Sequence, residues 1–195
     1  MYRKNALIRQ LVWLLGVLAL GISSPGVAQD SKPGLFEVRS AQTELEDGVY
    51  LLDARLQYIL SSEALEALDN GLPLNFMIEI EVIESRRFWV DDTVAALQVR
   101  LQLQYHALSQ RYLVRSLNSG DQESFATLYS ALNNLGRLSG IPIIDASLLH
   151  PTRAHRMRVR SMLEFRDFAG PLRSLAFWLD NWHLQSEWFT WPLDR

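Results

Sequence analysis

Cysteine is absent from this chain of 195 residues. Its absence excludes a disulfide framework and the lipid-modified cysteine that a lipoprotein signal requires at its cleavage point. The folded part must therefore be stabilised by its own hydrophobic core. Lysine is scarce as well, because Lys32 is the single lysine after residue 28. The cations of the folded part are arginines, which favour bidentate or stacked pairing, so we expect many of them to have partners within the fold.

A long hydrophobic run is also missing. The apolar stretch Leu11–Ile22 has 12 residues, whereas a membrane-spanning helix needs roughly 20. It follows a basic start and precedes two small residues, Gly26 and Ala28, which suit the −3 and −1 positions of a cleavage site. The basic residues are Arg3, Lys4 and Arg9. This layout predicts a secretory signal peptide over residues 1–28. Retention of the leader as an anchor in the cytoplasmic membrane is the alternative.

The remaining 167 residues suffice for one domain with a hydrophobic core. We expect a polar linker over residues 29–34, closed by Pro33-Gly34, and a single domain over residues 35–195. Loss of the leader leaves 16 Lys and Arg against 22 Asp and Glu, a net charge of −6. A mildly acidic domain is poorly suited to nucleic acid, whose binding depends on neutralising phosphates.

Alternation of apolar and polar residues dominates the domain and predicts antiparallel strands with one buried face. The expected strands cover residues 36–44, 52–60, 74–83, 97–106, 111–117, 157–165 and 182–191. Asp47-Gly48 is a hairpin signal that pairs the first strand with the second.

Three helices are expected among these strands. The first is opened by Ser61 and stopped at Asn70-Gly71. The second is capped by Asp121 and ends near Gly136, and the third starts at Pro171 and runs to Leu179. The predicted fold is α+β: a bent or sandwich-like, mainly antiparallel sheet of about six or seven long strands with two or three helices.

Several sequence segments together resemble a family of small exported proteobacterial proteins classified as a domain of unknown function. The segments are Leu52-Asp53-Ala54, residues 67–74, residues 103–112, residues 131–136, Pro171-Leu172-Arg173 and residues 182–191 with Trp182, Leu184, Trp188 and Trp191. The resemblance spans nearly the whole exported chain and transfers no activity and no catalytic residue. Family members look like genomic neighbours of a membrane histidine kinase, so the resemblance implies an accessory role outside the cytoplasm, with an envelope protein such as a membrane sensor kinase as the expected partner.

No pattern of catalytic or metal-binding residues stands out, so we predict no catalytic residue, no metal site and no cofactor. The histidines lack metal-ligand spacing, and a nucleophilic Gly-x-Ser-x-Gly motif is missing. Glu79 and Glu81 project from one face of a strand about 7 Å apart, a separation compatible with a carboxylate pair of a glycosidase. A hydrolase that uses Glu79/Glu81 or His106 in a sheet-lined cleft is therefore an alternative, beside pairing of these glutamates with Arg86, Arg100 or Arg158 across strands.

A row of arginines is the second charged feature. Arg156, Arg158 and Arg160 share one strand face, and like charges on one face repel unless anions cover them. The Glu79/Glu81 row is one candidate cover, and an external anion or lipid headgroup is the other. We therefore name Arg156, Arg158, Arg160 and His106, which lies at a hairpin end, as candidate residues for binding an anionic ligand or partner.

Tryptophan gathers near the C-terminus, where four of the six lie within residues 178–191. On an alternating strand Trp182, Leu184, Ser186 and Trp188 share one side, and Trp191 lies on the other. One side is then core, and an exposed remainder is typical of an interaction patch. Trp182, Trp188 and Trp191 are the candidate patch residues.

These observations favour a periplasmic, non-enzymatic binding or accessory module at the cell envelope. Its expected contacts are an envelope protein such as a membrane sensor kinase, the membrane surface, and no nucleic acid. A structural envelope component is a further alternative to the hydrolase.

Overall fold

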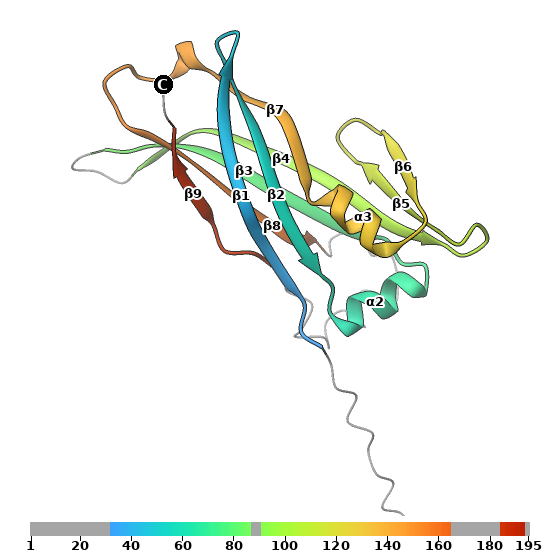
Figure 1. The fold of residues 1–195 in the computed structure, drawn as a ribbon. Helices are drawn as coiled ribbons and strands as arrows, with labels where there is room; N and C mark the ends of the chain where they lie inside the picture. Colours follow the sequence, from blue (N-terminus) through green and yellow to red (C-terminus); the bar gives the residue numbers. More distant parts are fainter. Residues whose placement is uncertain (1–31, 87–90, 165–183, 194–195) are drawn as a thin grey trace, which may run out of the picture. The chain divides into compact units, whose positions relative to one another are not determined.

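The computed structural model describes residues 32–86, 91–164 and 184–193, which form nine β strands and two α helices (Figure 1). The strands are β1 (Leu35–Glu46), β2 (Val49–Ile59), β3 (Leu74–Glu84), β4 (Asp92–His106), β5 (Arg111–Ser116), β6 (Gln122–Phe125), β7 (Arg137–Asp145), β8 (His155–Glu164) and β9 (Phe189–Pro192). The helices are α2 (Ser62–Asp69) and α3 (Leu128–Leu135), with a short 3-10 helix, η1, at Ala146–Leu148.

The strands build two antiparallel sheets, a three-stranded one in the order β1-β2-β7 and a six-stranded one in the order β6-β5-β4-β3-β8-β9. The sheets cross face to face in Figure 1, and a single large core cluster draws residues from both. This sandwich-like arrangement confirms the predicted α+β fold. The described residues contain two more strands than the sequence pattern suggested.

The hairpin predicted at Asp47-Gly48 is confirmed. Glu46 lies opposite Val49 in the register, so the loop has two residues. Both have positive φ, 48° at Asp47 and 82° at Gly48, as the tight turn that matches strand twist requires. The turn fixes the register from Glu46–Val49 to Ser40–Arg55, and a bulge between Val38 and Ser40 then shifts it by one residue, so that Phe36 pairs with Tyr58 and both side chains join the core between the sheets.

Three aromatic rings join the two sheets in the centre of the core. The Phe76 ring of β3 stacks on Phe36 of β1 with centroids 5.6 Å apart and meets Tyr58 of β2 edge-on at 5.0 Å. The Tyr58 hydroxyl lies 3.0 Å from Ser161 Oγ, and the Ser161 hydroxyl donates a hydrogen bond to the carbonyl oxygen of Met77 at 3.2 Å. Burial raises the pKa of the Tyr58 phenol. The one polar group in this cluster is thus kept neutral and hydrogen-bonded, as burial demands.

Helix α2 begins where the sequence predicts. The side chain of its N-cap Ser61 accepts a hydrogen bond from the backbone N–H of Ala64, and Asn70 is its C-cap. Ala64, Ala67 and Leu68 are its buried residues. Leu65 on the same helix is exposed, because only one narrow face of the eight-residue helix contacts the core.

The expected helix capped by Asp121 is wrong in its first half. Residues 122–125 form the short strand β6, and helix α3 starts only after Thr127, whose side chain accepts a hydrogen bond from Ser130 N–H. Asp121 instead accepts a hydrogen bond from the Ser119 hydroxyl in the turn before β6. Phe125, which the predicted helix would have contained, instead pairs with Tyr112 across β5 and β6.

Strand β7 was missed because its pattern is irregular. It contains Gly140 and Pro142, and its pairing with β2 shifts register twice. Bulges of this kind break the alternation that identifies a strand in a sequence. The expected leader over residues 1–28, the expected helix from Pro171 and Trp182 lie outside the described residues.

Candidate functional site

The arginine row of β8 lies opposite the acidic row of β3. Arg160 is the cross-strand neighbour of Glu79 and Arg158 that of Glu81. Arg160 Nε lies 2.7 Å from Glu79 Oε2, and Arg158 Nη2 lies 2.6 Å from Glu81 Oε2. Arg156 forms an ion pair with Asp91. The three predicted anion-binding arginines are thus each paired with a carboxylate of the chain.

Trp188 covers this set of ion pairs. Its ring centroid lies 4.3 Å from Cζ of Arg158 and 4.4 Å from Cζ of Arg160, which places one indole over two guanidinium groups. Such cation–π contacts add to the attraction of the carboxylates. The residues Glu79, Glu81, Arg158, Arg160 and Trp188 are called the ion-pair layer below.

Trp188 does not lie on the same side as Leu184 and Ser186, as it would on an unbroken strand. Leu184 and Ser186 are buried on the core side, where Ser186 Oγ accepts a hydrogen bond from Ser161 N–H. Trp188 stacks on the opposite, arginine-bearing face of β8. The strand β9 begins only at Phe189, so alternation does not extend back through Trp188. Trp191 is half-buried and its Nε1–H donates to Thr43 Oγ1 at 3.3 Å.

His106 lies at the β4–β5 turn, as the sequence places it. Its Nδ1 lies 2.8 Å from Ser109 Oγ, and the residue is exposed. Among the described residues its side-chain hydrogen bonds are with Ser109 and not with Glu79 or Glu81, which lie in the middle of β3. The geometry therefore gives His106 a local partner in its own turn.

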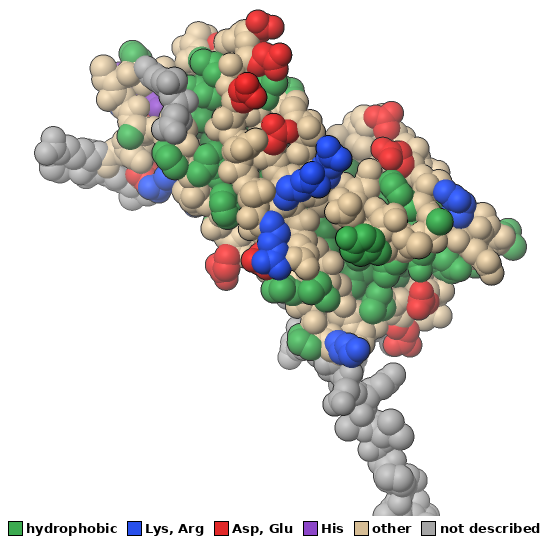
Figure 2. Space-filling model, viewed as in Figure 1, with side chains coloured by type: hydrophobic (Ala, Val, Ile, Leu, Met, Phe, Trp, Pro, Cys, Tyr) green, Lys and Arg blue, Asp and Glu red, His purple; other side chains and the backbone are tan. Residues whose placement is uncertain are grey.

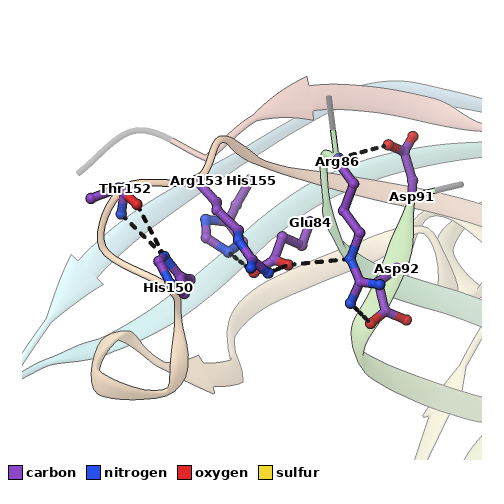
Figure 3. Close-up of polar contacts among 8 residues, drawn as sticks. All are labelled: Glu84, Arg86, Asp91, Asp92, His150, Thr152, Arg153 and His155. Atoms are coloured by element: carbon purple, nitrogen blue, oxygen red, sulfur yellow. Dashed lines mark hydrogen bonds and ion pairs between the residues drawn. The ribbon is translucent and has the colours of Figure 1, made fainter. Parts of the chain in front are cut away.

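A second charged cluster, not singled out in the sequence, surrounds the end of β3 (Figure 3). Glu84 is buried and forms an ion pair with Arg153, and its Oε1 lies 3.7 Å from Arg86 Nε. Its Oε2 lies 3.5 Å from Nε2 of the buried His155. The hydrogen bond from Arg153 holds the pKa of Glu84 below its ordinary value, against the opposing effect of burial. Glu84 therefore stays ionised at neutral pH and ties the loop before β8 to β3.

A third feature is an uncompensated pair of arginines on the three-stranded sheet. Arg55 of β2 and Arg137 of β7 are direct cross-strand neighbours, and both are exposed. Within residues 32–86, 91–164 and 184–193, neither guanidinium has a carboxylate within 4.0 Å. Figure 2 shows Lys and Arg side chains over the middle of this face, with acidic ones toward the β1–β2 hairpin. Here the fold places two like charges side by side without neutralising them.

Two hollows adjoin this arginine pair, and Arg55 lines both. The smaller, about 280 Å³, is polar and includes Arg137, Asp53 and Ser139. The larger, about 480 Å³, lies between β2 and α3 and includes Arg39, Tyr129 and Leu132. Tyr129 is 80% exposed although it is a large aromatic residue. A volume in this range suits a small organic ligand.

The larger hollow exists because β7 stops short along β2. The β2–β7 pairing ends at Arg55 and Arg137, and Gly136 just before it caps α3. Leu56 N–H donates to Gly136 carbonyl oxygen at 2.7 Å, so α3 takes the place of β7 beside the last residues of β2. The three residues Arg55, Arg137 and Tyr129 were missed by sequence reasoning. The local sequence carries no signal for them, because the exposure of Tyr129 and the pairing of Arg55 with Arg137 depend on how α3 and β7 pack beside β2.

The described parts of the chain contain no group of three or more acidic or histidine side chains arranged to hold a metal ion. None of the helices within them is long and apolar enough to cross a membrane.

Comparison with known proteins identifies the family. Residues 35–192 match the family model described as a domain of unknown function (DUF4390), and the chain belongs to this family. Neither the curated proteins nor the solved structures yield a match. The predicted resemblance to a domain of unknown function is thereby confirmed, and the function has to be inferred from the site.

Proposed function

We propose that this chain is a non-enzymatic binding module that acts outside the cytoplasm, at the cell envelope. The observation that carries the binding role is the Arg55–Arg137 pair, which is exposed, in register and without a carboxylate among the described residues. The basic, apolar and small-residue layout of residues 1–28 supports export. The family resemblance supports the extracytoplasmic part of a membrane sensor kinase as the partner that the module serves.

The reason for binding is energetic. Like charges directly opposite each other on a sheet destabilise it by roughly 0.2–1 kcal/mol, whereas the three arginines in a row on β8 are each paired with a carboxylate. Natural proteins keep destabilising arrangements where activity needs them. A purely structural envelope component would have no use for such a pair.

The hydrolase alternative receives less support. A general acid and a general base must reach the substrate, whereas Glu79 and Glu81 are engaged by Arg160 and Arg158 under the Trp188 ring. His106 lies exposed in a turn. The described side chains therefore offer an accessible cationic face rather than a converging pair of acid and base.

Replacing Arg55 with glutamine is expected to raise the free energy of unfolding by a few tenths of a kcal/mol at low salt, because the repulsion with Arg137 disappears. The gain should shrink in concentrated salt, which screens the repulsion. Urea unfolding of the two proteins at low and high NaCl measures both effects. Arg115→Gln, an exposed arginine of β5 on the other sheet, is the matched control and should show no such gain. A clear loss of stability in Arg55→Gln would assign the arginine a structural role and contradict the proposal.

Export is tested by the mass of the protein recovered from cells. The full-length chain with a C-terminal tag, expressed in a Gram-negative host, is expected in the periplasmic fraction with an intact mass that begins at Gln29. A membrane-bound species that still carries Met1 would show a retained anchor. A cytoplasmic species with Met1 would overturn the extracytoplasmic part of the proposal.

A further inference from the structure

We propose that the larger hollow between β2 and α3 binds an organic anion, with its phosphate or carboxylate held by Arg55 and Arg39 and its apolar body against Tyr129 and Leu132. This inference rests on the proposed binding function and adds the chemical class of the ligand.

The charged half of the hollow is built by two arginines with different surroundings. Arg55 has no partner within the described residues, so its whole donor fork is available. Arg39 already donates to Gln57 at 2.6 Å and to Glu37 at 2.9 Å, which holds its guanidinium in place beside β2. A guanidinium fork matches the geometry of phosphate and carboxylate oxygens. One arginine is thus positioned and the other is free to close on the anion.

The apolar half comes from the helix. Tyr129 and Leu132 lie one turn apart on α3 and line the hollow together with Ile59. Tyr129 is 80% exposed and Ile59 is 45% exposed, an unusual amount of apolar surface beside two arginines. Aromatic rings of this kind stack on flat ligands at little entropic cost, because few torsions are fixed. The combination selects a ligand that carries its charge next to a ring or an aliphatic group.

The position of the carboxylates decides which hollow takes the anion. Asp53 lines the smaller hollow, where it accepts a hydrogen bond from Gly140 N–H at 3.1 Å, and it would repel a bound anion there. No Asp or Glu lines the larger hollow, although Glu37, outside its lining, forms an ion pair with Arg39. Arg55 is therefore the arginine of this hollow whose charge no described carboxylate neutralises. Arg137 is not among its lining residues but lies opposite Arg55, and it adds to the positive potential at its edge.

A flat anionic membrane fits this face less well than a ligand that enters the hollow. The β1–β2 hairpin on the same sheet carries exposed Glu44, Glu46 and Asp47, and Figure 2 shows acidic side chains gathered at that end of the view. A bilayer laid across the sheet would meet these carboxylates together with the arginines. The positive charge is therefore confined to an area that suits a single anionic group.

The experiment uses the chain as recovered from cells and follows its backbone amides by NMR while phenyl phosphate is added. Phenyl phosphate is expected to saturate in the millimolar range or below and to shift amides of β2 from Arg55 to Ile59 and of α3. Inorganic phosphate, which lacks the ring, and phenol, which lacks the charge, should each bind at least roughly tenfold more weakly. In a separate experiment the protein is mixed with vesicles of anionic lipid, and the bound fraction is measured.

Two variants and a control locate the site. Arg55→Gln should weaken phenyl phosphate binding roughly tenfold or more, because a charge-assisted bidentate contact is lost. Tyr129→Ala should reduce the affinity for phenyl phosphate to that for inorganic phosphate. Arg115→Gln should leave binding unchanged. The amide spectrum of each variant shows that it is folded.

Several outcomes overturn the assignment. These are an unchanged affinity in Arg55→Gln, shifts that map to the ion-pair layer, no saturable binding up to about 10 mM, or binding to lipid vesicles alone. If phenyl phosphate fails to bind while Arg55→Gln still stabilises the fold, the ligand class is wrong and the proposed binding function stands. If Arg55→Gln destabilises the fold, the proposed function itself fails.

Discussion

Replacing Gly136 with alanine is expected to lower the free energy of unfolding by about 3 kcal/mol. An added Cβ would lie 2.1 Å from the carbonyl oxygen of Leu56, a backbone atom of β2 that cannot turn aside as a flexible side chain could. The conformation of Gly136, φ −81° and ψ 5°, is open to any residue, so the whole cost arises from the lack of space. Helix α3 would have to move away from β2, and the 2.7 Å hydrogen bond from Leu56 N–H to Gly136 would stretch or break.

Urea unfolding and the melting temperature measure this effect, and the latter should fall by roughly 10 °C. Asn133→Ala is the matched control, because Asn133 is an exposed residue of the same helix and its replacement should change stability by less than about 0.5 kcal/mol. Equal stability of Gly136→Ala and the parent protein would show that β2 and α3 do not approach as described. Gly136→Ala should also disturb the larger hollow, which β2 and α3 enclose.

Replacing Phe76 with alanine is expected to cost about 3–5 kcal/mol. The Phe76 side chain is fully buried and is the ring of the six-stranded sheet that contacts both Phe36 and Tyr58 of the three-stranded sheet. Its removal would leave a cavity between the sheets that rigid strands on both sides cannot close. Chemical denaturation measures the loss.

Phe76→Leu serves as the comparison. Leucine keeps most of the buried volume and loses the ring contacts, so it should cost about 1–2 kcal/mol. If alanine cost no more than leucine, the interior around Phe76 would collapse freely, and the ring would not join the sheets as the structure shows. A difference of at least about 1 kcal/mol between the two variants is the expected result.

The arginines of β8 and the Arg55–Arg137 pair show that strand register decides whether an arginine is neutralised by a carboxylate. The sequence places Arg156, Arg158 and Arg160 on one face, and the structure does the same. Whether such a row is paired or free depends on which strand lies beside it. The register between β3 and β8 brings Glu79 and Glu81 opposite Arg160 and Arg158, and a shift of one residue would have turned them to the other face.

Arg55 and Arg137 are separated by more than 80 residues, and nothing in the sequence around either of them predicts that they are cross-strand neighbours. Their juxtaposition requires β7 to pair with β2, through two register shifts. The arrangement of Tyr129 beside them requires α3 to end at Gly136, where there is room for a close approach. The candidate site is therefore a product of long-range pairing, and the sequence reasoning selected other residues.

The sequence by itself determined the features that depend on neighbours along the chain. Alternation identified β1–β5 and β8, Asp47-Gly48 identified the first hairpin, and Ser61 identified the start of α2, because pleat, turn and cap are local properties of the backbone. The tertiary structure alone decided the irregular strands β6 and β7, the late start of α3, the partners of the arginines and the hollow at Arg55. These depend on which distant segments come into register, and the free energy of that pairing outweighs local propensity.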